Sequence, residues 1–124
     1  MAMKTEFERI KNEIMRSSAL TISRWQRKLF EEGPQSFAKV VSDIAKSVEE
    51  TAKRVAGATR CISYIDSEIG TDIMRLVVSC DVPRYGKHLI YKQQLFDYQI
   101  DVEPGELKVR SFHVRTPLIE LSEW

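Results

Sequence analysis

The sequence has only two cysteines, four prolines and five glycines in 124 residues, and it lacks a long hydrophobic run. No window approaches the eighteen or so consecutive apolar residues of a membrane helix, and the charged start lacks the apolar centre of a secretory signal. An excess of one charge is also missing, because 19 basic residues oppose 18 acidic ones. We therefore expect a cytoplasmic protein with no membrane partner, and nucleic-acid binding is unsupported.

The sequence has few residues arranged for catalysis, metal binding or cofactor binding. In a reducing cytosol, Cys61 and Cys80 are expected to be packed thiols rather than a disulfide. Together with His88 and His113 they could supply four zinc ligands, but the close paired spacing of zinc sites is absent. Phosphate loops, GxSxG elbows and HExxH helices are absent too. The sequence therefore predicts no catalytic residue, no metal and no cofactor, and it favours a protein that is not an enzyme.

The clearest positive feature is a change in the period of the apolar residues near Gly57. Before this glycine they recur every three or four positions, which is typical of amphipathic helices. After it they alternate, which is typical of strands. Apolar residues make up 43% of the chain and charged residues 30%, as in an average globular protein. The pattern predicts a single domain over residues 1–124.

The first half predicts a helical hairpin over residues 5–56. A capping box at Thr5–Glu8 marks the expected start of the first helix. Gly33-Pro34 is expected to end it, because glycine accepts positive φ and proline suits the first turn of the next helix. Gly57 is the expected end of the second helix.

The second half predicts an antiparallel sheet over residues 60–116. Turn residues separate four alternating segments, with a bulge expected near Gln93-Gln94. Short turns require antiparallel neighbours, so the fold class is α+β, with two N-terminal helices packed on one face of a four-stranded antiparallel meander. The expected strands are 60–66, 73–82, 87–101 and 107–116, and residues 117–124 form a C-terminal tail.

Apolar residues on both sides of this sheet suggest a function, because two helices can cover only one face. We therefore expect a non-catalytic protein-interaction or self-association module that uses a sheet face or an edge, with a homodimer or another protein as partner. The predicted interface comprises Ile73, Val77, Tyr98, Phe112, Val114 and Trp124. The tail or further bulges could instead cover that face.

A second hypothesis places a small-molecule site, or a small enzyme, between the sheet and the helices. Its polar residues would be Tyr64, Tyr91 and His113, converging in an apolar pocket.

Overall fold

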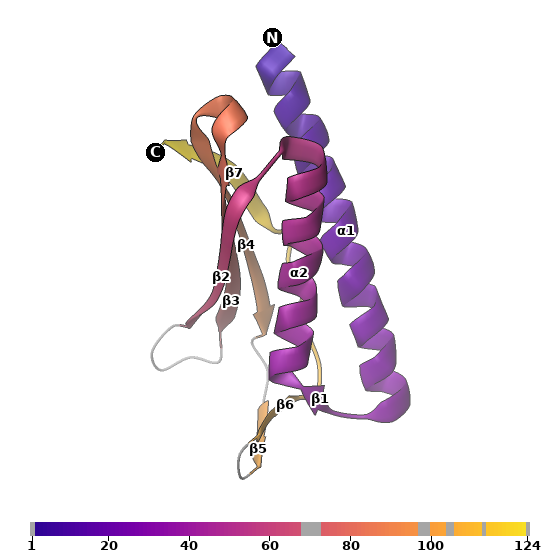
Figure 1. Cartoon of the computed structure of the whole chain (residues 1–124). Helices are drawn as coiled ribbons and strands as arrows, with labels where there is room; N and C mark the ends of the chain where they lie inside the picture. Colours follow the sequence, from indigo (N-terminus) through magenta and orange to yellow (C-terminus); the bar gives the residue numbers. More distant parts are fainter. Residues whose placement is uncertain (1, 68–72, 97–99, 104–105, 113, 124) are drawn as a thin grey trace.

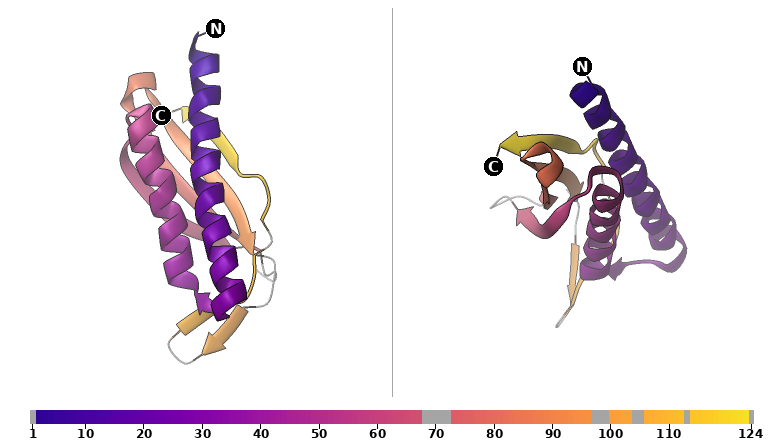
Figure 2. Two further views of the ribbon diagram at one scale, coloured as in Figure 1. Left: turned by 90° about the vertical axis from the view of Figure 1, so that its right-hand side faces the viewer. Right: turned by 45° about the horizontal axis from the view of Figure 1, so that its top comes forward.

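The computed structural model describes residues 2–67, 73–96, 100–103, 106–112 and 114–123. Helix α1 (Ala2–Glu32) and helix α2 (Phe37–Ala56) precede a four-stranded antiparallel sheet. Both helices lie on one side of that sheet, as Figures 1 and 2 show. The predicted α+β class is therefore confirmed. In the described part of the chain, neither helix has an apolar stretch sufficient to cross a membrane.

The ends of the helices follow the sequence signals in part. Ser36 caps α2, because its hydroxyl accepts a hydrogen bond from the Lys39 N–H, and Gly57 ends the helix with φ at 66°. The start of α1 differs from the prediction. The helix begins at Ala2, so the expected capping residue Thr5 lies inside it. The good helix formers that precede Thr5 extend the helix by one turn.

The main sheet contains strands β2 (Thr59–Ser67), β3 (Met74–Val82), β4 (Lys87–Phe96) and β7 (Leu118–Glu123), in that order. A short 3-10 turn at Pro83–Tyr85 joins β3 to β4. A register shift leaves Leu95 without an opposite residue on β3, close to the predicted bulge. This extra residue lets the side chain of Leu95 enter the core, where it is fully buried.

The fourth strand is not the predicted one. Residues 107–116 do not join the main sheet; instead Glu106–Val109 (β6) pairs with Gln35–Ser36 (β1) and Ile100–Glu103 (β5) in a small second sheet. The predicted tail supplies the fourth strand, because Ile119 and Leu121 face the core on one side of β7. The apolar residues of 107–116 change parity after Val109, so one straight strand cannot bury them all.

The core fills the space between the helices and one face of the main sheet. Its central residues are fully buried and come from both layers: Ile14, Ile44, Val48, Leu76, Val78, Leu89 and Tyr91. Closely packed apolar side chains from facing elements therefore hold the two layers together.

Cys61 and Cys80 form a disulfide between β2 and β3, which corrects the expectation of two free thiols. Their strands are neighbours, and a β-bulge between Thr59 and Ile62 lies at the bond. The sequence argument assumed a reducing compartment and could not show that the two strands pair at this register. The bond ties the first strand of the sheet to the second.

We expect reduction of this disulfide to lower the free energy of unfolding by about 3 kcal/mol, because the bond closes a loop with a sequence separation of 19 residues. Urea unfolding with and without dithiothreitol measures the difference. The matched control is the Cys61→Ala/Cys80→Ala variant, whose stability should not respond to the reductant. Equal unfolding midpoints for oxidised and reduced wild type would contradict the expectation.

Candidate functional site

Strand β2 forms one edge of the main sheet. Only β3 pairs with it among the described strands, so one side of its backbone has no strand partner there. Seven of its nine side chains are exposed, including two large apolar ones: Ile62 is 62% exposed and Tyr64 is 53% exposed. A long edge strand with exposed apolar side chains is a template for pairing with another strand.

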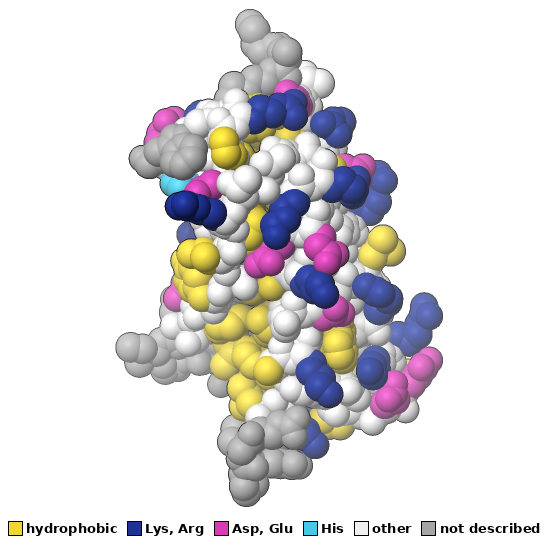
Figure 3. All heavy atoms as spheres, viewed as in Figure 1, with side chains coloured by type: hydrophobic (Ala, Val, Ile, Leu, Met, Phe, Trp, Pro, Cys, Tyr) yellow, Lys and Arg dark blue, Asp and Glu magenta, His cyan; other side chains and the backbone are white. Residues whose placement is uncertain are grey.

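An apolar groove of about 620 Å³ runs beside this edge, between β2 and helix α2. Phe37, Val41 and Ala45 line it from the helix, while Ile65 and Leu76 line it from the sheet. In Figure 3, apolar side chains gather on this face between the helix and the edge strand. The groove and the edge are continuous, because Ser63, Tyr64 and Ile65 belong to both. We call the two together the β2 edge site.

The opposite edge of the sheet is protected. Strand β7 has six residues against nine in β2, and Pro117 precedes it. Glu120 and Glu123 are exposed on it. Short length, charge and a flanking proline all discourage strand pairing. Strand β2 has its charges and a bulge toward its ends, at Arg60, Asp66 and between Thr59 and Ile62, but its segment Ile62–Ile65 carries none of these features, so β2 is the less protected edge.

The predicted interface residues do not share one sheet face. Val77 is outside the main core cluster but is only 3% exposed, and its cross-strand neighbours are Tyr64 and Lys92. Ile73 is half-buried just before β3. Phe112 and Val114 follow β6, outside the main sheet. The remaining two, Tyr98 and Trp124, lie outside the described residues.

Phe112 packs against the main core and Val114 lies beside helix α1, next to Ser18 and Ala19. Both were predicted from the alternation of residues 107–116, which is not a strand of the main sheet. They therefore lie on the helix side of the molecule, away from the face to which we assigned them. Whether any of them contacts a partner stays a prediction.

The residues predicted for a pocket are also separated. Tyr64 is exposed on β2, whereas Tyr91 is fully buried beneath the helices. The third residue, His113, lies outside the described part of the chain. The Tyr91 hydroxyl donates a hydrogen bond to Gln93 Oε1 at 2.9 Å, and Gln93 Nε2 donates to the carbonyl of Arg115. Tyr91 thus belongs to a buried polar chain in the core.

Burial raises the pKa of Tyr91 to about 12, and a hydrogen bond with Ser18 opposes part of that rise. The neutral phenol is therefore the stable form at any physiological pH. A phenol that stays protonated and hydrogen-bonded inside the core positions β4 against α1 and is poorly suited to acid–base chemistry near neutral pH.

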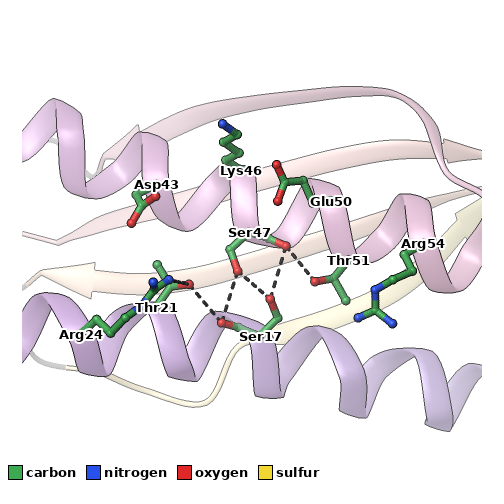
Figure 4. Close-up of a pocket in the computed structure, with 9 residues that line it drawn as sticks. All are labelled: Ser17, Thr21, Arg24, Asp43, Lys46, Ser47, Glu50, Thr51 and Arg54. Carbon is green, nitrogen blue, oxygen red and sulfur yellow. Dashed lines mark hydrogen bonds between the residues drawn. The ribbon is translucent and has the colours of Figure 1, made fainter.

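A second groove, of about 500 Å³, lies between the two helices and is polar (Figure 4). At its base the hydroxyls of Ser17 and Ser47 lie 2.6 Å apart. Thr21 and Thr51 donate hydrogen bonds to the carbonyl oxygens of these two serines. All four hydroxyls therefore already have hydrogen-bond partners within the protein, and Ser17 and Ser47 join the two helices at this point.

The rim of this polar groove carries charges of both signs, with basic and acidic residues interspersed: Arg24, Asp43, Lys46, Glu50 and Arg54. A mixed rim creates no strong local field that would select an anion or a cation. Trp25 Nε1 donates a hydrogen bond to Asp43 Oδ2 at 2.8 Å, so this carboxylate already has a partner within the protein. The polar groove is therefore a weaker candidate than the β2 edge site.

Within the described residues, no three His, Cys, Asp or Glu side chains lie close enough to hold a metal ion. His88 and Asp81 form a pair on adjacent strands, with His88 Nδ1 2.8 Å from Asp81 Oδ1. Comparisons with protein-family models, curated proteins and solved structures found no match. The functional argument therefore depends on geometry and chemistry alone.

The buried phenol gives a pH-dependent prediction. A folded-state pKa raised to about 12 stabilises the fold fully below pH 10, and this stabilisation is lost as the pH rises through 12. We expect the free energy of unfolding to fall by roughly 2–3 kcal/mol more in wild type than in Tyr91→Phe over that interval. Urea titrations of both proteins at pH 8 and pH 12 measure it, and parallel losses would contradict it.

Proposed function

We propose that this protein is a non-catalytic protein-interaction module that binds a strand of another polypeptide at the β2 edge site. The observation that supports this function is the continuity of an unprotected edge strand with an apolar groove. A strand that joins a sheet edge gains affinity from main-chain hydrogen bonds and specificity from pockets for alternate side chains. The β2 edge site offers both features.

The two sides of an added strand would meet different surfaces. Side chains on the helix side would enter the groove against Val41 and Ile65, where apolar surface is removed from water. Side chains on the other side would pack beside Ile62 and Tyr64, which are the large exposed apolar residues of β2. A partner segment with apolar residues on both faces therefore fits better than a fully polar one.

The small-molecule alternative is less well supported. The groove is open along the sheet edge, and the polar groups predicted to converge there are apart, with Tyr64 at the surface and Tyr91 in the core. The cytoplasmic location stays a prediction. The Cys61–Cys80 disulfide counts against it, because cytosolic proteins rarely keep such bonds.

A random dodecapeptide library, presented to immobilised protein at low density, tests the proposal. We expect the enriched peptides to carry apolar residues at successive positions, and so on both faces of the added strand, and to bind the Ile62→Lys/Tyr64→Lys variant at least about tenfold more weakly, because two apolar cross-strand contacts are lost. Hydrogen exchange should show that bound peptide protects those amides of residues 62–67 that point away from β3. These substitutions replace exposed side chains, so the fold should be retained.

Leu20→Lys is the matched control, because Leu20 is also 62% exposed but lies on helix α1. This variant should bind the enriched peptides as wild type does. Peptides that bind the β2 variant and the control equally well, or that protect amides of α1 instead, would show that the β2 edge site is not the binding surface.

A further inference from the structure

Basic side chains gather along helix α1, although the chain as a whole has almost no net charge. Residues 14–30 and residues 110–117 contain basic residues but no acidic one. All of these basic residues are exposed: Arg16, Arg24, Arg27, Lys28, Arg110 and Arg115. The nearest acidic residues on α1, Glu13 and Glu31, lie outside this stretch. A local excess of positive charge therefore exists that the overall composition conceals.

The two basic segments lie side by side and enclose two apolar pockets. The chain that follows β6 runs beside α1, as Figure 2 shows. A pocket of about 280 Å³ lies between Ala19 of the helix and Val114 of residues 110–117. A second pocket of about 460 Å³ lies between Phe30 and Phe112. Among the described residues, neither pocket is lined by an acidic side chain. We call the two pockets, with the residues that line them, the α1 basic groove.

Large apolar side chains at this groove are left in water. Phe30 is 91% exposed at the second pocket, and Val114 is 41% exposed at the first. Leu20, which follows Ala19 on the helix, is exposed as well. Burying a side chain of this size contributes about 1.5–3 kcal/mol relative to leaving it in water. Each of these side chains can therefore anchor a partner.

Arginines surround the apolar side chains. Arg27 lies one helical turn before Phe30, and at about 100° per residue it lies within about 20° of Leu20 around the helix axis. Arg110 lines the same pocket as Phe30, and Arg115 lines the other pocket. A partner that fits this surface must present apolar and negatively charged groups together.

The flank of α1 that faces α2 is electrically more balanced. Arg24 lines the polar groove together with Asp43 and Glu50, and the Lys28 ammonium lies 5.0 Å from the centre of the Trp25 ring. Attraction for an anionic partner is therefore strongest on the other flank, where the α1 basic groove lies.

We propose that the α1 basic groove binds an acidic amphipathic helix of another protein. The α1 residues that line the two pockets are about ten positions apart, so the pockets are about 15 Å apart along the helix. A partner helix lying along α1 would fill both pockets with apolar side chains about eleven positions apart, and its acidic side chains would meet the arginines. This surface is separate from the β2 edge site, and the inference does not rest on the proposed function.

The pockets favour a polypeptide over other anionic partners. Nucleic acids and anionic lipid headgroups also attract arginine. A phosphate backbone or a layer of headgroups has no apolar side chain that could enter the pockets, whereas an amphipathic helix has several. The exposed residues Ala19 and Ser23 are small, so a helix can approach α1 closely between the two pockets.

Fluorescence anisotropy with a labelled peptide tests the charges. The probe is a helical peptide of about eighteen residues with leucines at i, i+4, i+7 and i+11 and glutamates on both flanks. We expect Arg27→Glu/Arg115→Glu to bind it at least about tenfold more weakly than wild type at low salt, because two attractive contacts become repulsive. The matched control is Lys53→Glu/Lys92→Glu, which makes the same change of charge at exposed positions on α2 and β4 and should bind as wild type does.

Removing an apolar side chain tests the pockets independently of charge. Phe30→Ala should weaken binding of the same peptide about tenfold. Tyr64→Ala is the matched control, because it removes an exposed aromatic ring at the β2 edge site and should leave binding unchanged. A peptide whose leucines are replaced by alanine should bind wild type about tenfold more weakly. All these variants alter exposed side chains, so the fold should be retained.

Several results would overturn the inference. One is a peptide that fails to bind wild type, and another is a peptide that binds the charge-reversal variant and Phe30→Ala as tightly as wild type. Tighter binding of wild type to phosphatidylserine vesicles or to poly(uridylic acid) than to the peptide, lost in Arg27→Glu/Arg115→Glu, would assign the groove to lipid or nucleic acid instead. None of these results bears on the β2 edge site, because Ile62→Lys/Tyr64→Lys should bind the acidic peptide as wild type does.

Discussion

The packing of two helices against one face of a four-stranded sheet is the constraint on which the rest of this structure depends. The helix-facing residues of β3 and β4 are fully buried, for example Leu76, Val78 and Leu89. On β2 the corresponding residues Cys61 and Ile65 are only half-buried. The helical layer thus covers the centre of the sheet better than this edge. The incomplete cover creates the groove and leaves the edge available.

The edge strand needs other attachments because the helices hold it weakly. The Cys61–Cys80 disulfide joins it covalently to β3, and the pairs from Ile62 to Ser67 bind it through the antiparallel ladder. A strand fixed on one side and open on the other is organised before any partner arrives, which reduces the entropy cost of binding. The same features explain why the edge can stay exposed without fraying.

Much of the fold could be predicted from the sequence, because helix and strand periods are local properties. The stripe on residues 37–55 and the alternation in 74–82 each require only the side chains of that segment. The prediction of the fourth strand was wrong because two segments of the chain compete for the same place beside β4. From the sequence, both 107–116 and 118–123 could pair with β4. The second segment forms the strand, because Ile119 and Leu121 lie on the same face of it and pack against the core.

The candidate site was harder to predict, because it depends on neighbours. The sequence indicated that a sheet face or an edge carries surplus apolar residues, but it assigned them to Val77, Phe112 and Val114. The first is buried, and the other two lie outside the main sheet. The alternation of Ile62 and Tyr64 was a usable signal, but alternation does not reveal whether a strand is central or at an edge.

The sequence by itself determined the two helices, the first three strands of the main sheet and their antiparallel sense, because periodicity and turn residues act over a few positions. The tertiary structure alone decided which segment forms the fourth strand, the disulfide and the exposed surface of the edge. These features arise when distant segments compete for the same neighbour, and the outcome depends on which arrangement buries the most apolar surface while satisfying the backbone.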